Sequence, residues 1–241
     1  MTAFAALVGV SLKGLLGRRR TLLIGLLAGL PILVALLIRI GGARPDASEV
    51  LDTLVIRTVL PLVALVIGTG VLGSEIEDGT LIFQLLKPVP RWIIAIAKTA
   101  VAALLTAALV LPPMIVTGIL LGGTGSASIG LALGFTVAAL AGCIAYSVGF
   151  TALGVVTSRA LIVGLGYTLL WEGALAGILE GTRFLSVRQA TLGVAAGLTS
   201  ADIGKVPLTM PTSIAILVVV TVGGLLVAWS RLRAFQVRAA D

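Results

Sequence analysis

The segment TAVAALLTAALVLPPMIVTGILL, residues 99–121, contains no charged side chain and is long enough to cross a bilayer. About 20 apolar residues, at roughly 1.5 Å each, span the hydrocarbon core of a membrane. The apolar character continues well beyond this segment, because Arg159 is the only charged residue between Thr99 and Trp171. The whole chain of 241 residues is 59% hydrophobic and 11% charged, with a mean hydropathy of +1.19. A water-soluble domain needs more polar surface than this, so the sequence predicts a membrane protein.

Six apolar runs of this kind predict an all-α, polytopic membrane protein with six transmembrane helices. They cover approximately residues 21–40, 54–73, 93–121, 129–156, 161–179 and 213–229. Four prolines fall inside these runs, and neighbouring helices in a bundle can satisfy the carbonyl groups that a proline leaves free. We therefore expect residues 21–241 to form a single transmembrane domain.

Residues 1–20, before the first run, have a different pattern. Apolar residues recur at helical spacing on one face of this segment: Phe4, Leu7, Val8, Leu12, Leu15 and Leu16. This spacing predicts a cytoplasmic interfacial helix that ends in the basic residues 18–20, with an unstructured tail as the alternative. The run that follows is expected to be a retained span, because it is long for a signal peptide and no A-x-A cleavage site comes after it.

Basic residues are distributed unevenly between the two sides of the predicted helices. The chain has 17 lysines and arginines against 10 acidic residues, which gives a net charge of +7. Eleven of the basic residues fall on the side of the two termini, and six fall on the other side. The positive-inside rule then predicts that the protein lies in the cytoplasmic (inner) membrane with both termini in the cytoplasm. Because the basic residues flank spans, membrane lipids with anionic head groups are expected to be their partners rather than nucleic acid.

The chain lacks the residues that most catalytic and cofactor sites require. It contains no histidine and one cysteine, Cys143. Ser-His and Cys-His nucleophile pairs, His-ligated metals and iron–sulfur clusters are therefore excluded. No G-x-x-x-x-G-K-[ST] motif is present either, so the chain has no P-loop to bind ATP. We expect a chain that is not an enzyme and binds no metal or cofactor itself.

One charged segment, GSEIEDGTLIFQLLKPVPR at residues 73–91, separates the second run from the third. Three acidic residues come first. A segment with helical character follows, which Thr80 can cap and Pro88 stops. Residues 74–91 are therefore predicted to present a short cytoplasmic helix, braced between two spans, to a partner. An ordinary connecting loop with snorkelling lysine and arginine side chains is the alternative.

The pattern E-x-E-x-G-T-L-x-x-x-L-L-x-P-V-x-R, followed by a lysine seven residues on, resembles the type-2 ABC transporter permease family. The residues that carry this pattern are Glu75, Glu77, Gly79, Thr80, Leu81, Leu85, Leu86, Pro88, Val89, Arg91 and Lys98. The layout of an N-terminal interfacial helix, six spans and a long outer segment before the last span is similar to that of the family as well.

This resemblance implies the permease subunit of an ATP-driven ABC exporter, whose substrate pathway is formed by a dimer, expected to be a homodimer. A separate cytoplasmic ATPase would bind ATP and Mg and dock on a coupling helix of the permease. Carried onto this sequence, the ATPase-coupling residues are Glu75, Glu77, Asp78, Gly79, Thr80, Leu81, Lys87, Pro88 and Arg91. A secondary transporter and a non-transporting membrane scaffold or assembly factor are the alternative functions.

Two further features are predicted on the outer side. Residues 180–212 are too apolar for a free loop and too interrupted for a span, and the resemblance implies short re-entrant helices there; an amphipathic outer loop is the alternative. Glu172 falls within the fifth run, where a carboxylate is costly unless it has a partner. We expect Glu172 to pair with Arg57 or Arg183, either as an outer gate or as a structural ion pair.

Overall fold

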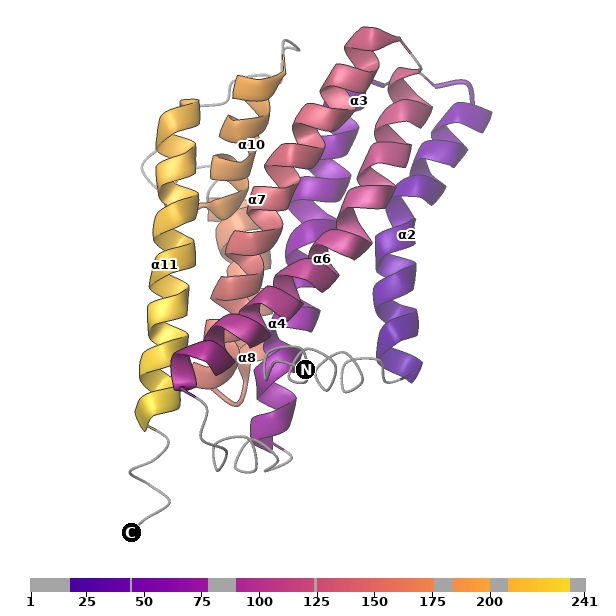
Figure 1. The fold of residues 1–241 in the computed structure, drawn as a ribbon. Helices are drawn as coiled ribbons and strands as arrows, with labels where there is room; N and C mark the ends of the chain where they lie inside the picture. The colour runs from indigo at the N-terminus through magenta and orange to yellow at the C-terminus, as the bar shows by residue number, and fades with distance from the viewer. Residues whose placement is uncertain are drawn as a thin grey trace, which may run out of the picture.

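The computed structural model describes residues 18–43, 45–77, 90–123, 125–175, 184–199 and 208–234. Most of these residues are helical, and none of them is in a β-strand. The helices form one elongated bundle in which the long elements run roughly parallel or antiparallel to one another (Figure 1). The all-α prediction is therefore confirmed for the described part of the chain.

The described elements are all helical. They are α2 (Arg18–Ile40), α3 (Ala47–Val50), η1 (Leu51–Val59), α4 (Leu60–Glu77), α6 (Arg91–Gly122), α7 (Ser126–Val156), α8 (Ala160–Gly166), η2 (Tyr167–Leu175), α10 (Val187–Leu198) and α11 (Met210–Ala234). The elements η1 and η2 are π-helical stretches. The first lies inside the continuous helix α3–η1–α4, and the second continues α8.

Four described helices are long and apolar enough to cross a membrane. They cover Ala47–Gly73, Arg91–Gly122, Ser126–Val156 and Met210–Ala234. Two further apolar helices, Ile24–Ile40 and Ala160–Gly173, are shorter. These lengths and compositions are those of a membrane-embedded helical protein.

The second predicted run differs from the structure at its start. The helix begins at Ala47 rather than near residue 54, because Asp46 caps it: the Asp46 carboxylate accepts a hydrogen bond from the Ser48 backbone amide at 3.2 Å. The helix therefore includes Asp52, which lies before the predicted start, as well as Arg57, which lies inside the predicted run. The last helix is also longer than the predicted 213–229 at both ends.

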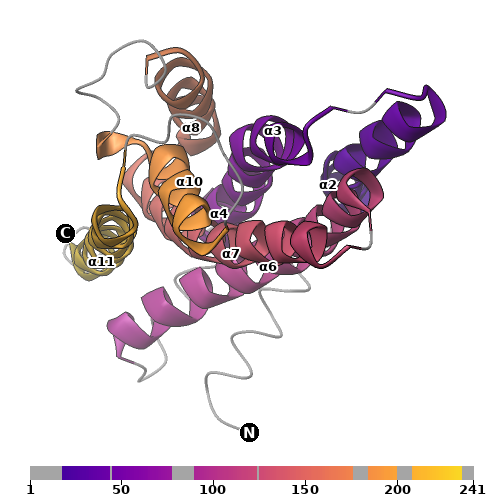
Figure 2. The ribbon, with the colours of Figure 1, turned by 90° about the horizontal axis from the view of Figure 1, so that it is seen from above.

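Helix α7 is the centre of the bundle and packs against α4, α6, α10 and α11 (Figure 2). Its contact with α4 is close because glycines face it from both helices. A Cβ atom added to Gly68 would lie 2.9 Å from the Phe150 Cβ, and one added to Gly154 would lie 3.1 Å from the Thr69 carbonyl oxygen. Small residues at such positions are typical of helix pairs in membranes, where packing rather than hydrophobic burial holds helices together.

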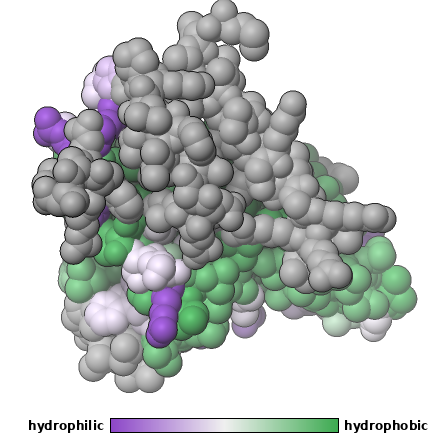
Figure 3. Space-filling model, turned by 90° about the horizontal axis from the view of Figure 1, so that it is seen from below, coloured by the Kyte–Doolittle hydropathy of each residue, from purple (hydrophilic) through white to green (hydrophobic). Residues whose placement is uncertain are grey.

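The outward surfaces of the bundle carry large apolar side chains. Exposed examples are Leu33 and Leu37 on α2, Leu169 and Leu170 on η2, and Val219 on α11. Seen from the lower end of Figure 1, the described surface is mostly hydrophobic (Figure 3). A surface of this kind is stable in contact with lipid and unstable in water.

Several predicted elements lie wholly or partly outside the described residues. These are most of the N-terminal interfacial helix at residues 1–20, the larger part of the 74–91 segment, and parts of the 180–212 segment. Within the last of these, residues 187–198 form α10, whose buried face packs against α7 and α11.

Candidate functional site

The predicted intramembrane acid, Glu172, is buried in η2 with only 1% of its surface exposed. Its carboxylate accepts four hydrogen bonds. The Tyr167 hydroxyl donates at 2.8 Å and the Val187 amide at 2.9 Å to one oxygen, while the Ser186 hydroxyl and the Arg188 amide, at 3.4 Å, donate to the other. A buried carboxylate is costly unless its oxygens are satisfied in this way.

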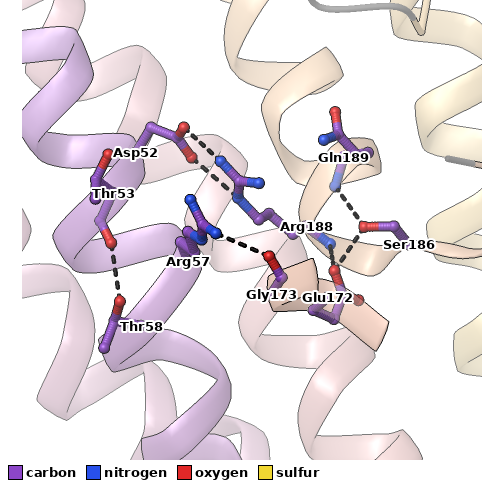
Figure 4. A network of polar contacts seen from close by, with 9 residues as sticks. All are labelled: Asp52, Thr53, Arg57, Thr58, Glu172, Gly173, Ser186, Arg188 and Gln189. Atoms are coloured by element: carbon purple, nitrogen blue, oxygen red, sulfur yellow. Dashed lines mark hydrogen bonds and ion pairs between the residues drawn. The ribbon is translucent and has the colours of Figure 1, made fainter. Parts of the chain in front are cut away.

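Three of these donors belong to the N-terminus of α10. Ser186 is the N-cap residue, and its hydroxyl oxygen accepts a hydrogen bond from the Gln189 amide at 3.1 Å (Figure 4). The free amides at the start of a helix, together with the helix dipole, stabilise a negative charge placed there. Glu172 therefore anchors η2 to the first turn of α10.

A second link joins α10 to η1. The Arg188 guanidinium donates two hydrogen bonds to the carboxylate of Asp52, with Nε–Oδ1 and Nη2–Oδ2 distances of 3.3 and 2.6 Å. The two side chains are only 11% and 22% exposed. A two-point contact of this type fixes the orientation of both partners as well as their separation.

A third link joins η1 to η2 and corrects the predicted ion pair. The Arg57 Nη2 donates to the Gly173 carbonyl oxygen at 2.8 Å, and among the described residues Arg57 makes no ion pair with Glu172 (Figure 4). Arg57 reaches the residue next to Glu172, but hydroxyls of Tyr167 and Ser186 and the amides of residues 187 and 188 already occupy the carboxylate. Arg183, the other predicted partner, lies outside the described residues.

We call these three links, formed by residues 52, 57, 172, 173, 186 and 188, the polar clamp. Both π-helical stretches contribute to it: η1 provides Asp52 and Arg57, and η2 provides Glu172 and Gly173. π-Helical turns are rare and are found most often at functional sites, because they displace carbonyl groups from the regular ladder. In η1 the Thr58 hydroxyl bonds to the Thr53 carbonyl oxygen, five residues earlier, at 2.9 Å.

One side of the clamp faces outward from the bundle. Thr53, Arg57 and Thr58 are exposed, although they lie on a helix that is otherwise long and apolar enough to cross a membrane. The start of this helix, Ala47, is roughly 15 Å above Arg57 at 1.5 Å per residue. The structure thus places a cation and two hydroxyl-bearing residues on the lateral surface of a membrane helix.

The residues predicted to couple to an ATPase are only partly described. Glu75 and Glu77 belong to the last turn of α4, and Arg91 begins α6. The Arg91 Nη1 donates to the Leu232 carbonyl oxygen at 2.8 Å, which ties the start of α6 to the end of α11. Lys98, about two turns further along α6, is fully buried. The remaining residues of this set, 78–81, 87 and 88, lie outside the described part of the chain.

Sequence reasoning missed Asp52, Tyr167, Ser186 and Arg188. One signal for them was present. Ser186 followed by Gln189 is an S-x-x-Q capping box, which predicts a helix beginning at residue 187. A helix start at that position supplies free amides, and these are a natural partner for a buried acid.

The described residues contain no group of three or more His, Cys, Asp or Glu side chains that could hold a metal ion. Comparison with known proteins adds no identification: no family model matches the chain, and no curated protein matches it.

Proposed function

We propose that this chain is the permease subunit of an ATP-driven exporter in the cytoplasmic membrane. In this proposal α2 and the α8–η2 helix complete a set of six spans with the four longer helices, and both termini lie in the cytoplasm. The uneven distribution of basic residues supports this orientation. The chain itself catalyses no reaction; a separate ATPase subunit holds ATP and Mg.

The observation that carries the proposal is the outward-facing side of the polar clamp. An arginine on the lateral face of a membrane helix is costly in contact with lipid. Arg57 is exposed in the single chain, and Thr53 and Thr58 flank it. Such a face is stable when it lines a wet pathway or when another protein surface covers it. Two copies of the chain that meet at η1 and η2 would enclose a polar pathway between them.

The energy for movement would enter at the opposite end of the same helix. Helix α4 ends at Glu77, at the start of the acidic part of the 74–91 segment. The resemblance of this segment to the coupling region of type-2 ABC permeases supports an ATPase contact there. Because α3, η1 and α4 form one continuous helix, a displacement at Glu77 acts directly on Arg57.

The test is ATP hydrolysis in proteoliposomes that contain the full chain together with the ATPase that co-purifies with it. We expect substitution of Glu75, Glu77 and Asp78 by alanine to reduce hydrolysis at least tenfold. The control is Arg231→Ala in the last turn of α11. It removes a charge at the same end of the bundle but outside residues 74–91, so it should leave hydrolysis unchanged. Equal activity of both variants would contradict the coupling assignment. Solute flux through the chain alone, without any nucleotide-hydrolysing subunit, would contradict the function.

An ion-coupled secondary transporter is the second candidate, because the clamp holds two carboxylates within the membrane helices. Ion coupling requires a carboxylate that can exchange its partner for a proton or a cation. Glu172 has four donors and Asp52 has a two-point contact with Arg188, so both are occupied. This occupation favours a structural role for the two acids. Flux driven by an ion gradient in proteoliposomes of the chain alone would favour the second candidate.

A further inference from the structure

Basic side chains gather at one end of the bundle, where α6 begins and α11 ends (Figure 1). The Arg91 Nη1 donates a hydrogen bond to the Leu232 carbonyl oxygen at 2.8 Å. Leu232 lies between Arg231 and Arg233 in the last turn of α11. This bond therefore brings arginines from two distant parts of the sequence together. We call Arg91, Arg231 and Arg233 the basic cluster.

The contacts that hold the basic cluster in place leave its charge unneutralised. Carbonyl groups in the last turn of a helix stabilise a cation there without cancelling its charge. The Arg233 guanidinium lies over the Trp229 ring, 4.7 Å from its centroid, and a contact with a ring face uses no hydrogen-bond donor. Arg231 and Arg233 are both exposed. Because a guanidinium carries several N–H groups, donors remain for an anion.

Acidic side chains do not accompany the basic cluster in the part of the chain that the structure describes. None of the described carboxylates belongs to α6, α7, α8 or α11. They are found at the cap of α3, in α3 itself, in η1 and in η2: Asp46, Glu49, Asp52 and Glu172. Three like charges held together repel one another, and an anion placed among them removes this repulsion. The basic cluster therefore favours an anionic partner.

The lengths of the two helices place this cluster at the surface of a membrane. Helix α6 has 32 residues and α11 has 25, so they are roughly 48 and 38 Å long at 1.5 Å per residue. The hydrocarbon core of a bilayer is about 30 Å thick, and about 40 to 45 Å with the head groups. The ends of both helices therefore reach the level of the head groups. Trp92, beside Arg91, is 53% exposed, and exposed tryptophans are typical of this level.

The surface next to the basic cluster becomes apolar along both helices. Ile96, one turn beyond Trp92 on α6, and Leu226, before the arginines on α11, are exposed. We propose that the basic cluster binds the head group of an anionic phospholipid. Guanidinium groups bind phosphate oxygens through paired hydrogen bonds, and the exposed apolar side chains contact the acyl chains. The proposal requires a membrane-embedded chain and does not depend on the transport function.

Two of the three tryptophans in the chain lie at the site, which allows binding to be measured directly. The test uses Trp171→Phe as the background, so that only Trp92 and Trp229 fluoresce. The full chain is placed in phosphatidylcholine nanodiscs that contain increasing fractions of phosphatidylglycerol with brominated acyl chains, which quench tryptophan on contact. A parallel series uses brominated phosphatidylcholine. We expect phosphatidylglycerol to bind at least about fivefold more tightly than phosphatidylcholine, since one basic residue near a membrane surface contributes about this factor.

Charge removal shows which arginines bind the lipid. The double variant Arg91→Gln/Arg233→Gln should reduce the preference for phosphatidylglycerol to less than about twofold, because two of the three cations are lost. Arg159→Gln is the matched control: Arg159 is an exposed arginine between α7 and α8, outside the basic cluster, and its loss should leave the preference unchanged. Thermal unfolding shows whether each variant is folded, and Arg231→Gln/Arg233→Gln replaces the first double variant if that protein does not fold.

Each of four outcomes would overturn the proposal. Equal quenching by the two lipids would mean that the cluster is neutralised within the chain, for example by the acidic residues 75, 77 and 78. An equal loss of preference in Arg159→Gln would mean a general attraction to the charged surface, and an unchanged preference in the double variant would place the lipid elsewhere. Displacement of the brominated lipid by glycerol phosphate would mean a site for soluble anions. No ATPase takes part in these measurements, so the proposed function keeps its own test.

Discussion

The contact between α4 and α7 and the polar clamp hold the same bundle together by opposite means. Between α4 and α7 the side chains at the closest points are absent: Gly68 and Gly154 let the two backbones approach until a single methyl group would collide. In the clamp, side chains bridge the elements through hydrogen bonds of carboxylate, guanidinium, hydroxyl and amide groups. The first contact depends on shape alone, and the second depends on directed hydrogen bonds.

This contrast indicates which parts of the molecule can move. Close-packed interfaces do not deform continuously, since small displacements forfeit many contacts at once. Hydrogen-bonded links between side chains can be exchanged one at a time for water or for other partners. The α4–α7 contact is therefore expected to persist as one body, whereas η1, η2 and α10 can change their relation to one another.

The largest effect is expected from Gly68→Leu, which puts side-chain atoms where Phe150 and the Ser147 backbone lie. We expect a loss of about 3 kcal/mol or more of unfolding free energy, because the backbone of α7 cannot withdraw. Thermal unfolding in detergent micelles, with recovery of monodisperse protein, measures this loss. Gly223→Leu, in open space, is the control; if the two variants unfold at the same temperature, the close contact is not a determinant of stability.

A somewhat smaller effect is expected from Glu172→Ala. This change removes the acceptor for the donors of residues 167 and 186–188. Each buried donor that finds neither a new acceptor nor water lowers the free energy of unfolding by about 1 to 3 kcal/mol. We expect a net loss of about 2 to 3 kcal/mol, because water can reach part of the emptied space. Glu172→Gln keeps one acceptor oxygen and should lose less. Equal unfolding temperatures for both variants and the native chain would show that the carboxylate does not anchor α10.

The link between Asp52 and Arg188 should contribute less again. A double-mutant cycle with Asp52→Asn and Arg188→Gln is expected to give a coupling free energy of about 1 kcal/mol, since the pair is partly exposed and solvent weakens it. Thermal or chemical unfolding of the two single variants and the double variant supplies the four corners of the cycle. Additive effects would mean that the two side chains are neighbours without a net interaction.

The smallest effect on stability is expected from Arg57→Gln. Glutamine retains an N–H donor, and Arg57 is exposed with one hydrogen bond to the Gly173 carbonyl oxygen. We expect a change below about 0.5 kcal/mol, as for other surface substitutions. Under the proposed function, the same variant should change ATP hydrolysis in the reconstituted complex, because Arg57 would face the pathway. A loss of stability as large as that of Glu172→Ala would place Arg57 in the structural part of the clamp.

The membrane helices were predictable because hydropathy depends on composition over some twenty residues and not on neighbours in space. The start of the helix at Ala47 was not found by hydropathy, since Glu49 and Asp52 lower the average before residue 54. The polar side chains of Asp52 and Arg57 both lie in this helix. The structure satisfies these side chains with Arg188 and Gly173, which are far away in sequence. Cap residues at Asp46 and Ser186 were the only local evidence for these boundaries.

The partner of Glu172 could not be predicted from depth and charge. Opposite charges at one level of the membrane suggested an ion pair, but the acid is satisfied by backbone amides of α10, whose position depends on tertiary packing. The two π-helical stretches also had no sequence signal, because a shift of hydrogen bonds by one residue changes neither composition nor periodicity enough to detect. Such stretches arise from the balance of contacts around them.

The π-helical stretch η1 gives the long helix from Ala47 to Glu77 an internal point at which its two ends can rotate relative to each other. A π turn holds one more residue than an α turn, and a shift of register by one residue rotates the adjoining segment by about 100°. If η1 became α-helical while α4 stayed seated on α7, the segment above it would turn and Arg57 would swing away from Gly173. A change of hydrogen-bond register within η1 would in this way rotate the outer end of the helix without any movement of α4.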